Sequence, residues 1–350
     1  MKLRLLYLYR NLTRNRLRSL LTCAAVALPI VIYVLSTAVV AGVQHFLDNS
    51  AKQLRLAVTQ KSSIANPLPV GYKSKIEALD PTGERIVSVC ALRWIGGKVE
   101  NSSVPLSTLA VDQDTFVQTF PEYQLTADEI AAWQRDHQAI VIGRAIAGQM
   151  GWKVGDRITI RPSLPPYTPM EFHVVSTAPL AQDPITNLFR LDYLQDELRR
   201  VQLHDDWVSF FFVKCATKAD VDYFRMAIDE NFANSQDETR TQDEKSFMTE
   251  YINQQFNLPR NLKILSAATV FVAIMAAANT MSMSFRDRTH EFATLKSMGF
   301  GPRFAFLLIQ SESLLLCALG GLLGAAGPYI AFMHTPLKDF TLPIIVHLEI

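Results

Sequence analysis

Three long apolar segments constrain this chain more than any other feature of its sequence. They cover Leu20–Val43, Ile264–Phe285 and Phe304–Met333. A helix needs about 20 apolar residues to cross the roughly 30 Å hydrocarbon core of a bilayer, and each segment is long enough. The first two contain no charged residue, and the third contains only Glu312. The sequence therefore predicts three membrane-spanning helices, over residues 20–43, 264–285 and 304–333.

The composition agrees with a membrane protein that has one large polar domain. Of the 350 residues, 49% are hydrophobic and 19% are charged, whereas soluble domains carry roughly 25% charged residues. The deficit lies in the three apolar segments, since the rest of the chain is ordinary polar sequence. This excludes a wholly soluble chain, a transporter with many spans and a disordered protein. The net charge of +1 also gives no basic footprint for binding nucleic acid.

The basic residues beside the spans predict the orientation, because short cytoplasmic segments retain Lys and Arg. The basic residues before the first span, with no acidic residue among them, are Lys2, Arg4, Arg10, Arg14, Arg16 and Arg18. The amino terminus is therefore expected in the cytoplasm and residues 44–263 on the outer side. Residues 286–303 then return to the cytoplasm, and residues 334–350 lie outside again.

Residues 1–19 interleave leucine and tyrosine with these arginines, a pattern typical of a helix lying in the membrane interface. A plain positively charged anchor is the alternative, and composition does not separate the two. A cleaved signal peptide is disfavoured, because its apolar core usually has only about 7–15 residues.

The domain between the first and second spans is predicted to be α+β, because strand-like runs alternate irregularly with short helical patterns. The fold class is thus transmembrane α-helices plus an α+β extracytoplasmic domain of two subdomains. The expected parts of residues 44–263 are a helix over 44–59, a first subdomain over about 60–187, a second subdomain over 188–233, a polar loop over 234–245 and a helix over 247–263.

Two features of this domain leave alternatives open. Cys90 and Cys215 either form a disulfide or remain two free thiols buried in strands, and the second is favoured because their spacing carries no signal. The proline-rich stretch Arg161–Pro169 either closes a constrained hairpin, which is favoured, or binds an adaptor or cargo.

The sequence shows no chemistry of an enzyme. Gly96–Gly97–Lys98 ends like a phosphate-binding loop, but the position five residues before Gly97 is Leu92 rather than glycine. His204, Asp205 and Asp206 are adjacent in sequence and do not share a face suited to a metal. No Gly-x-Ser-x-Gly nucleophile motif is present. Any ATP hydrolysis must therefore come from another polypeptide.

A short helix is predicted over Thr289–Met298, between the second and third spans. Phe292, Leu295 and Met298 recur every third residue and form one apolar stripe, and Gly299 ends the helix. Such a helix either docks into a groove on a partner or lies in the lipid interface. Periodicity alone does not decide between these two possibilities.

Several weak motifs in this region combine into one specific resemblance. The chain resembles the permease subunit of MacB/FtsX/LolCDE-type (type VII) ABC transporters. The positions that carry the resemblance are Arg288, Glu291, Leu295–Lys296, Gly299, Glu312 and Gly320–Gly321–Gly324. Asn11–Thr22 and Ile140–Ile160 are also similar to the family. The chain departs from it at Thr289–Phe292, where the family usually has a basic residue, Glu and Ile.

The resemblance implies a non-catalytic permease subunit of a bacterial cytoplasmic (inner) membrane. Two permeases, identical or paralogous, would pair with a dimer of ATPase subunits that bind ATP and Mg, with no cofactor on this chain. Residues 286–303 would carry the coupling helix, and the residues expected to contact the ATPase are Arg288, Glu291, Phe292, Leu295, Lys296, Met298 and Gly299. A periplasmic adaptor protein is a further expected partner besides the lipid bilayer.

The function implied is mechanotransmission, in which ATP hydrolysis drives conformational work in the periplasm for export or extraction of a substrate. The alternative is an FtsX-like signalling permease that activates a cell-wall hydrolase. The large outer domain favours the first, because the division-type relatives carry a smaller one. The family also has a fourth span, which we expect beyond the outer loop at residues 334–350.

The third span contains two further candidate features. Glu312 is a costly intramembrane carboxylate that either pairs with arginine at the cytoplasmic edge or reaches headgroup water. Gly320, Gly321 and Gly324 include the spacing that lets membrane helices approach closely. Packing within one subunit and contact in a dimer are both compatible with that spacing.

Overall fold

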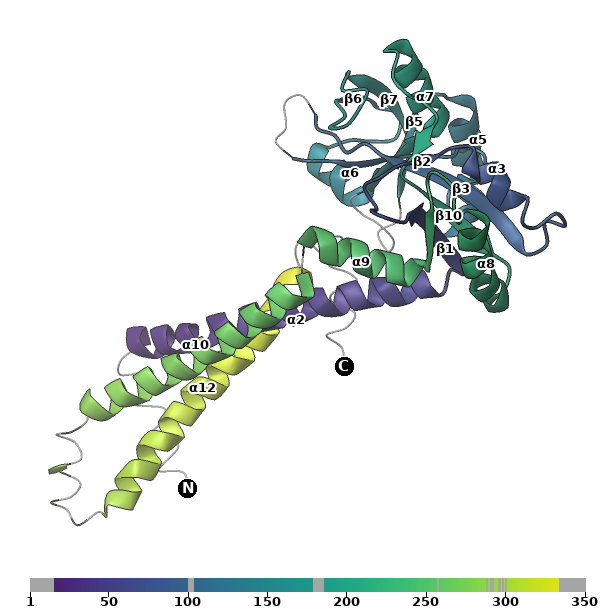
Figure 1. The fold of residues 1–350 in the computed structure, drawn as a ribbon. Helices are drawn as coiled ribbons and strands as arrows, with labels where there is room; N and C mark the ends of the chain where they lie inside the picture. Colours follow the sequence, from purple (N-terminus) through teal and green to yellow (C-terminus); the bar gives the residue numbers. More distant parts are fainter. Residues whose placement is uncertain are drawn as a thin grey trace. The chain divides into compact units, whose positions relative to one another are not determined.

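Three long helices carry the three apolar segments (Figure 1): α2 (Arg16–Ala51), α10 (Leu258–Asp287) and α12 (Pro302–Met333). All three are long and apolar enough to cross a membrane, which confirms the predicted number of spans within the described part of the chain. The computed structural model describes residues 16–99, 104–178, 186–256, 258–287, 289, 293–294, 297, 299 and 301–333.

These helices leave many large apolar side chains uncovered. In α10, for example, the side chains of Phe271 and Ile274 are 64% and 61% exposed. Lipid is as apolar as these side chains, so their exposure is expected for helices within a bilayer. Pro29 lies inside α2 and Pro328 inside α12, and both are tolerated in membrane helices.

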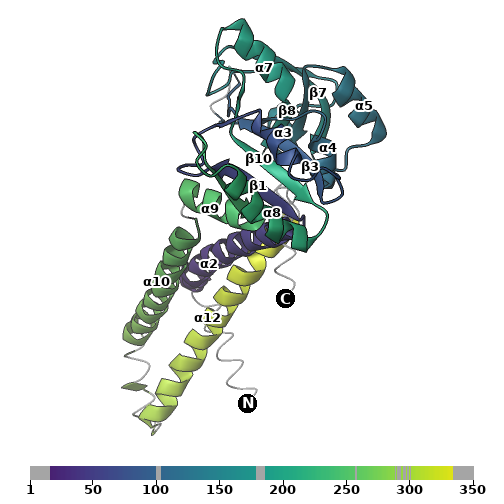
Figure 2. The same ribbon diagram turned by 45° about the vertical axis from the view of Figure 1, so that its right-hand side comes forward.

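The chain divides into two compact units, one formed by His45–Gln254 and the other by the helical parts before and after it. The first unit is the predicted α+β domain (Figure 2). Its strands are β1 (Arg55–Gln60), β2 (Leu68–Pro69), β3 (Ile86–Trp94), β4 (Ser107–Val111), β5 (Ala139–Gly143), β6 (Arg157–Ile160), β7 (Met170–Ala178), β8 (Thr186–Arg190), β9 (Trp207–Val208), β10 (Phe210–Cys215) and β11 (Thr239–Asp243).

The helices of this domain connect the strands and cover both faces of the sheet. They are α3 (Tyr72–Glu77), α4 (Phe116–Thr119), the 3-10 helix η1 (Pro121–Tyr123), α5 (Ala127–Arg135), α6 (Arg144–Met150), α7 (Leu191–Arg200), α8 (Lys218–Asn231) and α9 (Glu244–Phe256). The start of α5 shows how local sequence sets them. Thr126 accepts a hydrogen bond from the Glu129 amide while the Glu129 carboxylate accepts one from the Thr126 amide, which forms a complete capping box.

The described strands form a nine-stranded sheet in the order β11-β1-β10-β3-β4-β8-β5-β7-β6, and β2 pairs with β9 in a separate ribbon. The pairs β4·β8 and β5·β7 are parallel, and the other neighbours are antiparallel. The proline-rich stretch Arg161–Pro169 connects the antiparallel strands β6 and β7, which confirms the favoured hairpin interpretation.

The order of strands crosses the boundary that the sequence predicts near residue 188. β8 lies between β4 and β5, and β10 lies between β1 and β3. Residues from both expected subdomains thus share one continuous sheet. Strand pairing depends on hydrogen bonds between distant segments, whereas a division read along the chain follows only local changes of pattern.

Three local predictions also need correction. The helix expected over 44–59 ends at Ala51, and Arg55–Gln60 is strand β1. Leu54 has a φ of 53°, which breaks the helix, and the side chains that follow are buried on both faces of the sheet. The polar loop expected over 234–245 contains strand β11, which pairs with β1. Helices α9 and α10 replace the single helix expected over 247–263.

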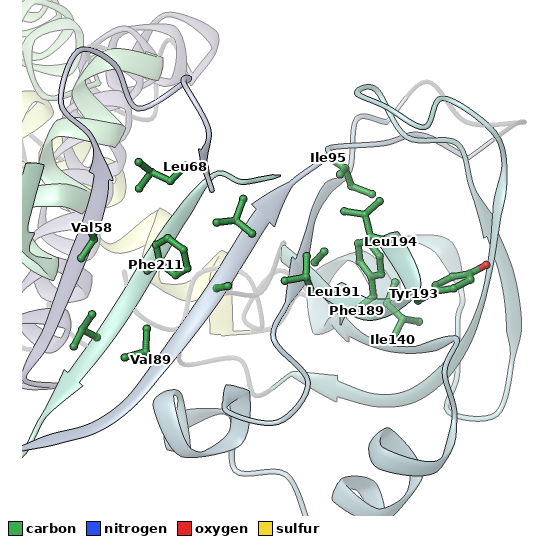
Figure 3. Close-up of a cluster of buried hydrophobic side chains, with 14 of the residues drawn as sticks. Val58, Leu68, Val89, Ile95, Ile140, Phe189, Leu191, Tyr193, Leu194 and Phe211 are labelled. Carbon is green, nitrogen blue, oxygen red and sulfur yellow. The ribbon is translucent and has the colours of Figure 1, made fainter. Parts of the chain in front are cut away.

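Alternate residues of the inner strands, such as β1, β3, β5 and β10, enter separate hydrophobic cores on the two faces of the sheet. One core contains Leu56 and Val58 of β1 and is covered by helices α3, α6, α7 and α8. Figure 3 shows part of it, from Val58 and Phe211 at one end to Leu194 at the other. The opposite core contains Ala57 and is covered by α4, η1, α5 and α9.

Candidate functional site

Gly320 and Gly324 of α12 lie directly against the backbone of α2. A Cβ atom at Gly320 would lie 2.9 Å from the carbonyl oxygen of Cys23, and one at Gly324 would lie 2.7 Å from that of Ala27. Backbone oxygens cannot rotate out of the way as a side chain can. Any larger residue at these two positions would therefore separate the helices, and we call this contact the α2–α12 crossing.

Gly321 has a different environment although it is adjacent to Gly320. A Cβ atom there would lie 3.7 Å from Cδ1 of Ile30, an ordinary van der Waals distance. The crossing therefore depends on two of the three glycines singled out from the sequence. The contacts lie between two helices of the same chain.

The order of contacts shows that α2 and α12 run in the same direction. Gly320 meets Cys23 and Val26, and Gly324 meets Ala27 and Ile30, so the partner number rises along both helices. Two helices that span a membrane in the same direction must have an odd number of membrane spans between them along the chain. Helix α10 can be that intervening span, in agreement with spans that alternate in direction.

A hydrogen bond also connects α2 and α12 at the crossing. The Cys23 thiol donates to the carbonyl oxygen of Leu316 over 3.7 Å, and the Val26 and Leu316 side chains are buried there. Cys317, the next residue of α12, is a free thiol like Cys23. Two native cysteines therefore lie on the facing helices at the crossing.

A buried ion cluster lies in the α+β domain, and we call its members, Arg55, Glu122 and Glu244, the Arg55 cluster. The Arg55 guanidinium donates through Nε and Nη2 to both carboxylate oxygens of Glu244, at 2.6 and 2.8 Å. Nη2 also lies 2.6 Å from Oε1 of Glu122, and Nη1 donates to the carbonyl oxygen of Thr119 at 2.9 Å. Arg55 is 4% exposed, so its charge is neutralised by carboxylates rather than by water.

The balance of charge in the Arg55 cluster is uneven, because two carboxylates share one guanidinium. Burial raises the pKa of the Glu244 carboxyl, the nearby Glu122 adds to the rise, and Arg55 opposes it. Within the described part of the chain, Oε2 of Glu122 is buried without a hydrogen-bond partner. The Phe120 ring lies against the guanidinium, with its centroid 4.5 Å from Arg55 Cζ.

A second ion pair, at the surface, joins α2 to α9. Lys245 Nζ lies 2.7 Å from Oδ1 of Asp48, with both side chains well exposed. Asp48 is in the last part of α2, and Lys245 is in the first turn of α9.

Comparison with protein families finds a match for the segment that contains the second and third apolar helices. Residues 263–344 match the family model described as FtsX-like permease C-terminal. The chain carries an FtsX-like permease domain. The match confirms the resemblance expected from the sequence, and it runs from just before the second predicted span to beyond the third.

Solved structures similar to the permease share only low identity with it. The periplasmic region of MacB from Actinobacillus actinomycetemcomitans is 10% identical, with a TM-score of 0.40 over 59% of this chain and 96% of that one. The extracellular domain of the noncanonic ABC-type transporter YknZ from Gram-positive bacteria is 8% identical, with a TM-score of 0.37 over 54% and 99%. No curated protein matches the chain by sequence. The family assignment therefore rests on the match of residues 263–344.

Most residues expected to contact an ATPase lie outside the described residues of the permease. These are Arg288, Glu291, Phe292, Leu295, Lys296 and Met298. Gly299 is described, and it lies in a turn with a φ of 86°. That left-handed conformation favours glycine, as expected for a helix stop. Glu312 is a residue of α12.

The sequence did not identify the Arg55 cluster. Arg55 stands between two leucines, and arginine is almost never buried without a charged partner. An arginine within a buried strand indicates a buried ion pair, but the local pattern predicts a helix over this segment. Glu122 and Glu244 carry no local signal, because 67 and 189 positions of chain separate each from Arg55 and only the tertiary fold brings them together.

The structure also places the remaining sequence candidates in the domain. Cys90 and Cys215 are free, buried thiols on opposite faces of the sheet, as the favoured interpretation held. Among the described residues, no three His, Cys, Asp or Glu side chains are grouped to hold a metal ion. The His204 ring stacks on Trp207 instead.

Proposed function

We propose that the chain is an ABC transporter permease subunit that couples ATP hydrolysis by a separate ATPase subunit to conformational work outside the membrane. This work drives export or extraction of a substrate. The ATPase dimer holds ATP and Mg, and this chain contributes no catalytic group. The partner across the membrane is a second copy of the permease or a paralogue.

The observation that carries this proposal is the FtsX-like match over residues 263–344 in a chain whose outer domain is joined directly to long helices. Helix α2 runs unbroken from Arg16 to Ala51, and strand β1 begins only a few residues later. On the other side, β11 ends at Asp243 and α9 begins at Glu244. Short connections of this kind favour transmission of movement, because a long flexible linker would absorb it.

The site residues have distinct roles in this mechanism. The helix over Thr289–Met298 binds the ATPase through its apolar stripe, and Arg288, Glu291 and Lys296 add polar contacts. The α2–α12 crossing makes two spans tilt together when the ATPase dimer closes. Glu312 supplies a charge in the third span that senses this tilt at the cytoplasmic edge.

The proposed location is a bacterial inner membrane, with the amino terminus in the cytoplasm and the α+β domain on the outer side. This orientation follows from the basic residues that precede the first span. The exposed apolar side chains of α10 are then in contact with lipid or with further spans. The proposal includes a periplasmic adaptor as a further partner of the outer domain.

Co-purification with the proposed ATPase partner tests the coupling step. Replacing Leu295 and Met298 with Asp should release the ATPase, because charge on the stripe prevents its burial. Ser297→Asp is the matched control, since Ser297 is exposed and lies on the opposite side of the helical wheel from the stripe. Retention of the ATPase by the double variant would disprove the docking role.

The choice between export and wall control needs a separate observation. A neighbouring gene for an adaptor would support export or extraction. A neighbouring amidase or peptidase gene, with hydrolase activation by the purified complex in the presence of ATP, would support the signalling alternative instead.

A further inference from the structure

The two segments that lead into and out of the α+β domain meet at the Arg55 cluster. Arg55 is the first residue of β1 and follows the end of α2 after Lys52, Gln53 and Leu54. Glu244 is the first residue of α9 and directly follows β11. The bidentate pair thus joins the first ordered strand of the domain to the first residue of its last helix.

The neighbouring contacts reinforce this junction. Strands β1 and β11 are paired there, with Leu56 opposite Asp243. The surface pair of Asp48 and Lys245 links α2 to α9. Glu122 holds the same guanidinium from the 3-10 helix η1, so the cluster also attaches both segments to the covering layer of the sheet.

Stability alone is a weak explanation for such a cluster. A buried ion pair is often no more stable than well-packed apolar residues of similar volume, because desolvation offsets the attraction. Here the charges are also unbalanced, and one Glu122 oxygen is unpaired within the described structure. A two-point guanidinium–carboxylate contact fixes the relative orientation of the groups that it joins. An apolar contact has no such directional preference.

We infer that the Arg55 cluster is a mechanical clamp. It holds the outer end of α2 and the start of α9 together, so that both segments move as one body and pass their displacement into the sheet through β1. This role rests on the proposed function and specifies how the domain receives movement. Releasing the clamp should uncouple the domain from the membrane helices while leaving the ATPase contact unaffected.

Hydrogen–deuterium exchange of the full permease–ATPase complex in lipid nanodiscs, with ADP or with ATP and vanadate, tests the clamp. The variants are Glu244→Gln, which keeps the side-chain shape, and Arg55→Lys, which keeps the charge but loses the fork. Glu238→Gln is the control, because its pair with Lys61 also joins two segments near β1 and β11 but is exposed. Exposed pairs contribute little.

In the wild type, ATP should change exchange both in α10 and α12 and in β1 and β10. In Glu244→Gln and Arg55→Lys, the change in α10 and α12 should persist and the change in β1 and β10 should be lost. Exchange at the start of α9 should also be about tenfold faster in both variants without nucleotide, because breaking a buried pair loosens its segment. Glu238→Gln should behave as the wild type.

Domain changes that persist in both variants would overturn the clamp and leave the proposed function intact. No ATP-driven change in any segment of the wild type would overturn the proposed function and the clamp with it. These two failures are therefore distinguishable.

A covalent link provides a second test that does not require the cluster variants to fold. Asp48→Cys and Lys245→Cys, joined by a short bifunctional maleimide in a chain whose Cys23 and Cys317 are replaced with Ser, should leave the ATP-driven changes in β1 and β10 intact. The clamp already keeps these ends together in every state. Loss of the changes on linking, with the unlinked double variant normal, would show that the ends must separate and would overturn the clamp.

Discussion

Gly324 and Ala27 are in such close contact that a Cβ atom on the glycine would lie 2.7 Å from the alanine carbonyl oxygen. At the α2–α12 crossing, a glycine of α12 is thus in direct contact with the backbone of α2. The crossing lies between two predicted membrane-spanning helices that are far apart in sequence. Because the contact is this close, it is sensitive to very small changes in side-chain size.

Gly324→Ala and Gly320→Ala should each weaken the crossing by about 1–3 kcal/mol, because the added methyl group forces the helices apart. The measurement is chemical cross-linking of native Cys23 to Cys317 in the purified full chain, followed by mass spectrometry of the linked peptides. The yield should fall in both variants. Gly321→Ala and Gly327→Ala are controls, since a Cβ atom at Gly321 makes only ordinary contact and one at Gly327 meets nothing within 4 Å. Equal yields in all four variants would contradict the close contact.

Glu312→Gln should reduce the ATPase activity stimulated by the assembled permease about threefold or more, since coupling residues typically contribute 0.5–2 kcal/mol. Co-purification of the complex should be unchanged. Glu312→Asp, which retains the charge, should restore most of the activity. Wild-type coupled activity in Glu312→Gln would rule out a role for the charge.

Asp80 should make the domain lose stability in acid. Its carboxylate accepts hydrogen bonds from the Arg85 and Ile86 amides and the Thr82 hydroxyl. The Ile86 amide and the Thr82 hydroxyl are the main causes that lower its pKa to about 2. A lowered pKa in the folded state stabilises the protein above the unfolded value, and this stabilisation is lost as pH falls through the folded value.

Asp80→Asn should therefore reduce the free energy of unfolding above about pH 5, and its difference from the wild type should shrink towards pH 2. Fluorescence of the full chain in detergent reports this, because all four tryptophans, Trp94, Trp133, Trp152 and Trp207, lie in the α+β domain. Asp222→Asn, on an exposed part of α8, should show no such trend. A difference that does not depend on pH would refute the role of the Asp80 carboxylate.

Cys90 and Cys215 should stay reduced and unreactive in the folded domain. Burial raises the pKa of each thiol to about 12, so only about one in ten thousand is thiolate at pH 8, and the thiolate is the reactive form. Iodoacetamide followed by mass spectrometry should label neither residue until guanidinium is added. Rapid labelling of either cysteine in the native chain, or a disulfide between them, would contradict the buried positions.

The predictability of this protein differs between its two units. The number of spans and the family could be predicted, because apolar length and the spacing of Gly320 and Gly324 are properties of local sequence. The α+β class of the domain was also predicted correctly. The local pattern predicts a helix at Arg55, since neither the turn at Leu54 nor the pairing partners of β1 leave a signal in the local sequence.

The sequence by itself determined that three helices can span a membrane and that the domain between the first two mixes strands with helices. Only the tertiary structure decided that β8 and β10 insert between earlier strands, that two of three glycines meet the α2 backbone, and that Arg55 binds Glu122 and Glu244. The physical reason is the range of the interactions. Hydropathy and periodicity act within a few turns of chain, whereas strand order, backbone contact and buried charge pairing depend on residues that folding alone brings together.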